Sequence, residues 1–334
     1  MTTLQATSPA DAGDEIQCTP DGRLRHLLSL RRLPRELIFE VLDRAERFLA
    51  DATEPAVRST TLSGRTIANL FFEPSTRTRA SFELAAKRLS ADVLNLDVST
   101  SSRIKGESIL DTMYTLQAMQ CDVFVVRDAA AGVPRMIAGA VREGVAVLNA
   151  GEASVSHPTQ GLLDLLTVRR ARPDLENLKV CIVGDIAHSR VARSAAEAFT
   201  IAGIAELRLV APERLQPHAS AFPGASLHSN LESGVTDADV VMALRIQRER
   251  IADAGDIPDP SDYARRFGLS ATNLAPASPD VFVMHPGPMN RGVEIDDATA
   301  DSARSLIAEQ VRNGVAVRMA LLEMVTETHL GVST

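Results

Sequence analysis

The chain has 334 residues with a net charge of −8, and 45% of them are hydrophobic against 23% charged. This length predicts about two domains, and the net negative charge argues against a general nucleic-acid-binding surface. No run approaches the roughly 18 apolar residues that cross a membrane, and the first residues lack a signal-peptide pattern, so the expected location is the cytoplasm.

Residues 1–22 are polar and show no sustained hydrophobic period, which predicts a mobile extension. From Leu24 onward, apolar runs rich in β-formers alternate with amphipathic segments that are typical of helices. The eight apolar runs are 65–73, 92–98, 121–127, 145–152, 179–185, 206–212, 239–245 and 280–286.

Continuous apolar strands separated by helices predict parallel sheets that are covered on both faces. Two groups of four strands therefore predict an α/β protein with two doubly wound parallel-sheet domains joined by helices. A last helix, at about 300–328, is expected to return to the first domain. The predicted parts are an extension (1–22), a first domain (23–155), a second domain (156–299) and a C-terminal helix (300–334).

Cys18, Cys121 and Cys181 are widely scattered and form no CxxC pair, so they predict reduced thiols and no metal site.

Polar residues follow the carboxyl ends of the predicted strands, where α/β sheets hold their ligands. The segment Pro74 to Arg79 stands between a strand and a helix start. Unpaired backbone amides at a helix start, together with hydroxyl groups and an arginine, suit a phosphate group. An ordinary Ser/Thr cap with solvated arginines explains this segment equally well on its own.

Six ordered motifs resemble those of the aspartate and ornithine carbamoyltransferase family, over essentially the whole chain after the extension. They are FFEPSTRTRASFE (71–83), KGES (105–108), HPTQGLLDL (157–165), VGDIAHSR (183–190), LRIQRER (244–250) and MHPGPMNRGVEI (284–295).

The resemblance implies a site for carbamoyl phosphate, with a catalytic set within it. The implied catalytic residues are Arg77, Thr78, Lys105, Arg127 and His157. The implied carbamoyl phosphate-binding residues are Ser75, Thr76, Arg77, Thr78, Ser101, Arg127, His157, Gln160, Gly287 and Pro288. Arginine suits this task because its planar fork binds phosphate oxygens in pairs.

The resemblance also implies a site for L-aspartate, whose two carboxylates match arginine side chains. The residues concerned are Lys105, Arg190, Arg245, Gln247, Pro286 and Gly287. Family members often have leucine where Gly287 stands, so this pocket is expected to be less rigid. The long charged loop 246–263 is expected to close over the second substrate.

In the family, the serine and lysine that correspond to Ser101 and Lys105 enter the neighbouring subunit's site, which implies a homotrimer with shared sites. The extension and the form of motif 284–295 resemble bacterial members that assemble with dihydroorotase-like chains. No nucleic-acid or membrane partner is expected.

The implied reaction joins carbamoyl phosphate to L-aspartate, giving carbamoyl aspartate and phosphate in the committed step of pyrimidine synthesis. Thr78, Arg127 and His157 would stabilise the oxyanion as the amine attacks, and the leaving phosphate would accept the proton. This chemistry implies no metal and no organic cofactor.

Two alternatives remain open. An ornithine carbamoyltransferase would carry a cysteine in an HCLP turn and an SMG loop, whereas this chain has HPGP at 285–288 and no SMG. A non-catalytic scaffold subunit would be expected to lack Lys105, His157 or an arginine of the site, and the sequence retains them.

Overall fold

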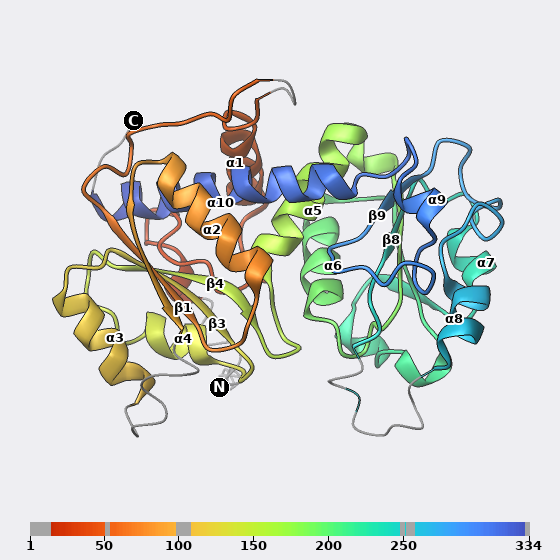
Figure 1. The fold of residues 1–334 in the computed structure, drawn as a ribbon, viewed down its shortest axis with the longest axis horizontal. Coiled ribbons are helices and arrows are strands. Elements are labelled where there is room, and N and C mark those ends of the chain that lie inside the picture. Colours follow the sequence, from red (N-terminus) through yellow and green to blue (C-terminus); the bar gives the residue numbers. More distant parts are fainter. Residues whose placement is uncertain (1–14, 51–53, 98–107, 248–250, 252–257, 331–334) are drawn as a thin grey trace, which may run out of the picture. The chain divides into compact units, whose positions relative to one another are not determined.

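The computed structural model describes residues 15–50, 54–97, 108–247, 251 and 258–330. The chain forms two compact units (Figure 1). Unit 1 comprises residues 1–159 and 315–334, and unit 2 comprises residues 160–314. The units therefore divide at 159/160 and 314/315, against the expected 155/156 and 299/300. Helix α5 (Pro158–Ala171) carries the first division and helix α10 (Ile307–Leu330) carries the second.

Unit 1 is built on a four-stranded parallel sheet in the order β2-β1-β3-β4. All four strands were predicted from their apolar runs, and β1, β3 and β4 are almost completely buried because both faces of the sheet are covered. The strands are β1 (Thr66–Phe71), β2 (Asp92–Asp97), β3 (Val123–Asp128) and β4 (Ala146–Glu152).

Helices cover both faces of this sheet. Helices α3 and α4 lie on one face, where Met113 and Ile137 pack on Leu70 and Phe124. Helices α1 and α2 and the second half of α10 lie on the other face (Figure 1). The helix bounds are α1 (Arg35–Glu46), α2 (Thr76–Arg88), α3 (Ile109–Ala118) and α4 (Val133–Ala138).

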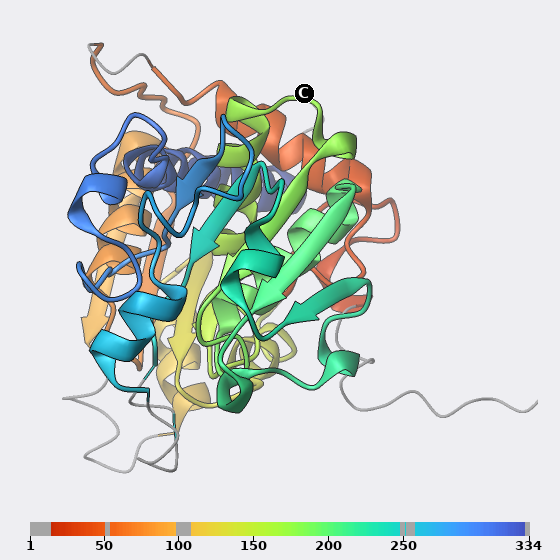
Figure 2. The same ribbon diagram turned by 90° about the vertical axis from the view of Figure 1, so that its right-hand side faces the viewer.

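Unit 2 is built on a five-stranded parallel sheet in the order β7-β6-β5-β8-β9, visible in Figure 2. The prediction of four strands here was wrong, because β7 was missed. That strand is short and only partly covered, and its sequence ASLH has no apolar run. The strands are β5 (Lys179–Val183), β6 (Glu206–Val210), β7 (Ala225–His228), β8 (Val240–Ala243) and β9 (Phe282–Met284).

Helices α6, α7 and α8 connect the strands of unit 2, α9 follows β9, and α7 packs along β5, β6 and β7. Their bounds are α6 (Arg190–Ala202), α7 (Leu231–Val235), α8 (Pro260–Phe267) and α9 (Asp297–Ala300). Short 3-10 turns are η1 (Glu15–Gln17), η3 (Leu175–Asn177), η4 (Glu213–Leu215) and η5 (Ala219–Ala221). Within the described residues, no helix is both long and apolar enough to cross a membrane.

Residues 15–22 of the predicted extension contact unit 1. The Gln17 side chain is buried, and its Oε1 accepts hydrogen bonds from the amides of Leu28 (2.7 Å) and Ser29 (2.9 Å). Cys18 forms an antiparallel bridge with Leu24. One polar side chain that satisfies two backbone donors gives this segment a fixed place. Residues 1–14 lie outside the described residues.

Candidate active site

The predicted phosphate cradle lies where β1 leads into α2. Ser75 is the N-cap residue, and its extended backbone (φ −161°, ψ 95°) turns the chain into the helix. Thr76 and Arg77 are exposed on the first turn, whereas Thr78 is buried. The first helical amides have no partner within the helix ladder and carry partial positive charge. This helix start therefore has the groups that an anion requires.

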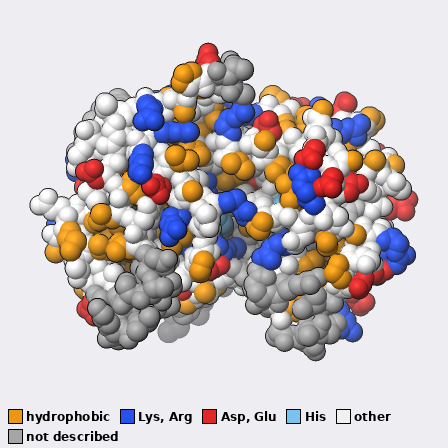
Figure 3. Space-filling view, in the orientation of Figure 1, with side chains coloured by type: hydrophobic (Ala, Val, Ile, Leu, Met, Phe, Trp, Pro, Cys, Tyr) orange, Lys and Arg blue, Asp and Glu red, His pale blue; other side chains and the backbone are white. Residues whose placement is uncertain are grey.

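Helix α2 is held in place by α10. Phe82 is fully buried under the guanidinium of Arg318, whose carbon lies 5.0 Å from the ring centroid. Arg318 also donates through Nη2 to Oγ1 of Thr159, at 3.3 Å. Figure 3 shows Lys and Arg side chains gathered over the region of α2. One cation from the C-terminal helix thus supports the cradle in unit 1 and adds to its positive surroundings.

Arg127 connects the carboxyl ends of three neighbouring strands. It lies near the end of β3 and is 8% exposed. Its Nη1 donates to the carbonyl of Ala150 in β4 (3.1 Å), and its Nη2 donates to Glu73 Oε1, just after β1 (3.2 Å). The carbonyl of Arg127 accepts from the amide of Phe72 at 2.8 Å. These contacts fix the guanidinium at the edge of the sheet where the cradle begins.

His157 is buried directly before α5. A tight loop brings it there, because Glu152 and Ser156 form an antiparallel bridge. The Glu152 side chain stabilises the loop by accepting from the amide of Gly132 (2.8 Å) and from Asn149 Nδ2 (3.2 Å). The exit of β4 therefore presents an imidazole from a rigid support. Ser101 and Lys105, predicted for the neighbouring subunit's site, lie outside the described residues.

In unit 2, the exits of β5 and β8 run side by side. The amide of Leu244 donates to the carbonyl of Val183 at 2.7 Å. Gly184 makes this approach possible, since a Cβ there would lie 2.5 Å from the carbonyl oxygen of Leu244. Arg190 begins α6 after the first exit, and Arg245 follows the second. The two arginines predicted to bind aspartate thus follow adjacent strands.

Asp185 ties these two exits together. Its Oδ1 lies 2.8 Å from Nδ1 of His188, and its Oδ2 accepts from the backbone amide of Gln247 at 3.2 Å. Gln247 Nε2 donates to the carbonyl of His188 at 3.3 Å. The Asp185 side chain is completely buried. Gln247, one of the predicted aspartate ligands, therefore has both its backbone and its side chain held by the β5 exit.

The turn after β9 carries Pro286, Gly287 and Pro288. The Gly287 amide donates to Nδ1 of His285 at 2.8 Å. Gly287 has φ +67°, in the left-handed region that glycine favours, and the Gly287–Pro288 peptide is cis. His285 is buried, and its Nε2 lies 3.3 Å from Glu294 Oε1. A buried imidazole held by two contacts therefore lies at the base of the turn.

Gln160 lies in the first turns of α5, at the start of unit 2, and is 8% exposed. Its Nε2 donates to Asp164 Oδ1 at 2.9 Å. No hydrogen bond to its Oε1 is formed by the described residues. An amide with its nitrogen engaged and its oxygen open is an acceptor for an N–H group.

Several structural partners escaped the sequence analysis. Three carboxylates inside the quoted motifs each hold a residue of the predicted site or of the turn beside it. Glu73 holds Arg127, Asp185 holds the backbone of Gln247, and Glu294 lies beside His285. Nothing in the order of the motifs indicates these pairs. Asp164 also stands in a motif, whereas its second partner, Gln310, is 146 positions away in the chain. Pairing over such a separation leaves no local pattern.

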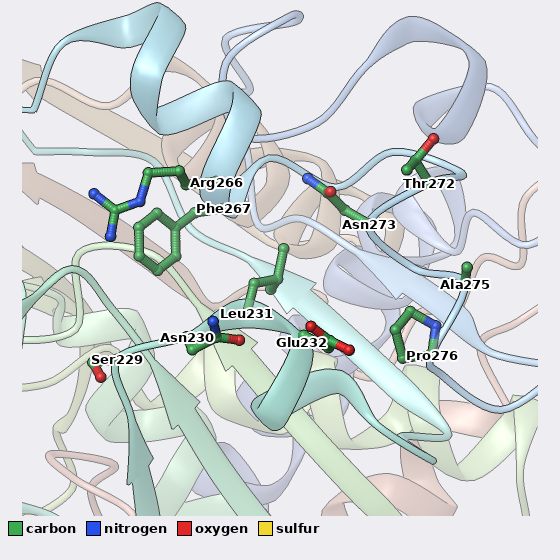
Figure 4. Close-up of a pocket in the computed structure, with 10 residues that line it drawn as sticks. All are labelled: Ser229, Asn230, Leu231, Glu232, Arg266, Phe267, Thr272, Asn273, Ala275 and Pro276. Carbon is green, nitrogen blue, oxygen red and sulfur yellow. The ribbon is translucent and has the colours of Figure 1, made fainter.

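A separate hollow of about 410 Å³ lies elsewhere in unit 2. Figure 4 shows Arg266 and Phe267 at the end of α8 facing Asn230 and Leu231 at the start of α7. Among the described residues that line it, none belongs to the predicted site. All three cysteines are free, and burial raises the pKa of the Cys181 thiol to about 12.

These features define a class of protein: an α/β enzyme of two doubly wound units, with a cradle for an anion at a helix start and arginines at strand ends. Family models identify the class more closely. Residues 25–170 match the carbamoyl-phosphate-binding domain of aspartate/ornithine carbamoyltransferase, and residues 176–325 match the aspartate/ornithine-binding domain.

Solved structures agree in fold. The catalytic subunit of M. jannaschii aspartate transcarbamoylase is 30% identical with a TM-score of 0.80, covering 92% of this chain and 100% of that one. Aspartate transcarbamoylase from Trypanosoma cruzi, solved with carbamoyl phosphate and aspartate, is 28% identical with a TM-score of 0.80, covering 93% and 99%. Ornithine carbamoyltransferase from Pyrococcus furiosus is 28% identical with a TM-score of 0.78, covering 92% and 98%.

The chain belongs to the aspartate/ornithine carbamoyltransferase family and is a carbamoyltransferase enzyme. The predicted fold class, with its two parallel sheets and helices, is confirmed.

Proposed function

We propose that the chain transfers the carbamoyl group of carbamoyl phosphate to the amino group of L-aspartate. The observation that carries this proposal is the pair of arginines at adjacent strand exits of unit 2. Arg190 begins α6, Arg245 follows β8, and Asp185 braces both exits through Gln247. A dicarboxylate substrate requires cations of this kind, whereas the second ammonium group of ornithine would be repelled by them.

Family membership alone leaves the amine open, because the aspartate and ornithine enzymes resemble the chain almost equally, at 30% and 28% identity. The turn after β9 favours aspartate. Its sequence is HPGP, without the cysteine of the ornithine-type turn. The chain also lacks an SMG sequence that would form the loop for the ornithine side chain.

For the first substrate, the helix start Ser75 to Thr78 supplies the phosphate site, and Arg127 contacts phosphate and carbonyl oxygens. Thr78, Arg127 and His157 stabilise the oxyanion that forms when the aspartate amine attacks the carbonyl carbon. The tetrahedral intermediate then expels phosphate, which accepts the amine proton. Positioned donors of this kind contribute on the order of 3 kcal/mol each when they face developing charge.

The same reasoning extends to assembly and setting. We propose a homotrimer in which Ser101 and Lys105 complete the neighbouring subunit's site, in a cytoplasmic protein that serves pyrimidine synthesis. A larger assembly with dihydroorotase-like chains is consistent with the form of motif 284–295. The support for these points is the resemblance of the motifs.

The decisive assay follows carbamoyl aspartate formation by the purified chain from carbamoyl phosphate and L-aspartate, with L-ornithine as the control amine. We expect turnover with aspartate and none above background with ornithine. Citrulline formation from ornithine would assign the ornithine reaction instead. Binding of carbamoyl phosphate without turnover of either amine would favour a non-catalytic scaffold.

A further inference from the structure

A buried hydrogen-bond chain runs through unit 2 behind Gln160. Asp164 Oδ1 accepts from Gln160 Nε2 at 2.9 Å and from Gln310 Nε2 at 2.7 Å. Gln310 Oε1 in turn accepts from the backbone amide of His285 at 2.9 Å. Asp164 is fully buried and Gln310 and His285 are 2% exposed, so water does not compete for these bonds. Residues from α5, α10 and the β9 exit are thus joined through one carboxylate oxygen.

This series of hydrogen bonds fixes the direction of the Gln160 amide. A carboxylate oxygen accepts hydrogen bonds, so it selects the NH2 end of each glutamine. Rotating the Gln160 amide by half a turn would bring two acceptors, Oε1 and Oδ1, face to face without a proton between them. Leaving buried polar atoms unsatisfied in this way costs about 1 to 3 kcal/mol. The acceptor Oε1 is therefore the end that Gln160 keeps available.

The other end of this series of hydrogen bonds reaches the turn after β9. Gln310 holds the amide of His285, and His285 Nδ1 accepts from the amide of Gly287 at 2.8 Å. Because Nδ1 is an acceptor, the ring proton resides on Nε2, which lies 3.3 Å from Glu294 Oε1. The same Glu294 oxygen accepts from the amide of Asn290 at 2.7 Å. The backbone of the turn is therefore anchored at both ends.

We propose that Asp164 and Gln310 are positioning residues that make unit 2 selective for a carbamoyl group over an acyl group. The inference rests on the proposed function and adds to it that Gln160 Oε1 and the backbone of the turn at 286–288 accept hydrogen bonds from the carbamoyl NH2. That NH2 is a donor and needs fixed acceptors. Acetyl phosphate has the same phosphate and carbonyl but a methyl group in place of the NH2, so it gains nothing from Gln160 Oε1.

Equilibrium binding without any amine tests the proposal. Dissociation constants for carbamoyl phosphate, acetyl phosphate and inorganic phosphate are measured by titration calorimetry on the full chain. In Asp164→Leu, the Gln160 amide is free to rotate. The dissociation constant of carbamoyl phosphate should therefore rise about five- to tenfold, which corresponds to one lost hydrogen bond. The dissociation constants of acetyl phosphate and inorganic phosphate should stay within about twofold of the wild-type values, since the phosphate contacts are assigned to the α2 start.

Two further variants separate positioning from general damage. Asp164→Asn keeps an oxygen at the shared position and should restore the wild-type ratio of carbamoyl to acetyl phosphate affinity. Thr167→Val removes the 2.9 Å bond from Asn313 Nδ2, which also joins α5 to α10. That variant should lose stability while leaving the affinity ratio unchanged.

Equal weakening of all three ligands in Asp164→Leu would overturn the proposal, as would an unchanged affinity for carbamoyl phosphate. If Asp164→Leu does not fold, Gln310→Met carries the test. It leaves the bond between Asp164 and Gln160 in place but frees the amide of His285, and it should lower the affinity ratio about two- to fivefold. A wild-type ratio in Gln310→Met would then overturn the proposal.

The outcome is independent of the amine assignment. A wild-type protein that prefers carbamoyl phosphate to acetyl phosphate, yet forms no carbamoyl aspartate, would contradict the proposed function and leave the positioning role standing. A wild-type protein that binds carbamoyl phosphate and acetyl phosphate with equal affinity would contradict the positioning role itself.

Discussion

Glu73 accepts a hydrogen bond from Arg127, with Nη2 and Oε1 3.2 Å apart, at the edge of the unit 1 sheet. Arg127 is also one of the two arginines assigned to carbamoyl phosphate, and the Glu73 carboxylate partly neutralises its guanidinium. The Glu73 side chain is 22% exposed and the Arg127 side chain 10% exposed, so solvent screens their attraction only in part. A phosphate that binds here must share the guanidinium with Glu73.

Glu73→Gln should therefore bind inorganic phosphate more tightly. Glutamine keeps an oxygen that accepts from Arg127 but removes the negative charge that repels the anion. We expect the dissociation constant for phosphate to fall about fivefold at low ionic strength, and the difference to shrink as salt is added. Titration calorimetry at two salt concentrations measures both effects. Weaker phosphate binding would mean that Glu73 acts chiefly by orienting Arg127.

Arg245→Ala should raise the KM for aspartate more than about tenfold, because a charge-assisted hydrogen bond to a carboxylate is worth roughly 1.5 to 3 kcal/mol. The dissociation constant of carbamoyl phosphate should stay within about twofold. Arg266→Ala is the matched control, since this exposed arginine of unit 2 lines the separate hollow of Figure 4. The kinetics of Arg266→Ala should equal those of the wild type. Loss of carbamoyl phosphate binding in Arg245→Ala would overturn the assignment.

Hydrophobic runs and strand ends predicted much of this molecule. Continuous apolar segments such as CDVFVVR gave the buried parallel strands, and the rule that ligands meet strand ends drew attention to Arg127, Arg190 and Arg245. The edge strand β7 was missed because it is half-exposed and has no apolar run. The direction of the Gln160 amide was beyond reach as well, since its acceptor Asp164 is shared with Gln310, which lies 146 positions further along the sequence than Asp164.

Gly184→Ala should destabilise unit 2 by about 2 kcal/mol or more and raise the KM for aspartate. Its φ of +143° disfavours any side chain, and the new Cβ would lie 2.5 Å from the Leu244 carbonyl. The β8 exit, which carries Arg245, would have to move. Gly203→Ala is the control for φ alone, because Gly203 has φ +78° and nothing within 4 Å. Gly203→Ala should lower the free energy of unfolding by only about 1 kcal/mol and leave the KM for aspartate unchanged. Thermal unfolding measures the first effect and the activity assay measures the second.

Acid should destabilise unit 1 through His26. This side chain is fully buried and its Nδ1 accepts from the amide of Val147 at 3.1 Å. Burial, together with the nearby charges of Arg25 and His329, lowers the pKa of His26 from 6.5 to about 3. The protonated form therefore prefers the unfolded chain, so this stability is complete above pH 6.5 and is lost as pH falls toward 3.

For His26 alone, the loss at pH 5 is about 2 kcal/mol relative to pH 7.5. His26→Asn keeps an acceptor for the Val147 amide and cannot take up a proton. The unfolding free energy of this variant, measured with denaturant, should fall less steeply between pH 7.5 and 5. Identical slopes in variant and wild type would show that His26 does not titrate on unfolding.

The last prediction concerns the proposed sharing of sites between subunits and rests on the family role of Lys105, a residue outside the described part of the chain. A Lys105→Ala subunit and an Arg77→Ala subunit should each be inactive alone, since one lacks the cation given to the neighbour and the other lacks the phosphate contact. A ring of three uses heterologous contacts, so each site pairs one chain's Arg77 with its neighbour's Lys105.

Mixing the two inactive proteins under conditions that exchange subunits should therefore restore activity. In a ring with two chains of one kind and one of the other, a single interface joins an intact Arg77 to an intact Lys105, so at most about one site in three is active. Hybrids are separated by a charged tag on one parent, and carbamoyl aspartate formation is measured per trimer. Parents mixed without exchange should stay inactive. Purified hybrids without activity would assign Lys105 to its own subunit's site or remove it from catalysis, because the ring geometry guarantees one complete interface in every hybrid if the lysine acts across it.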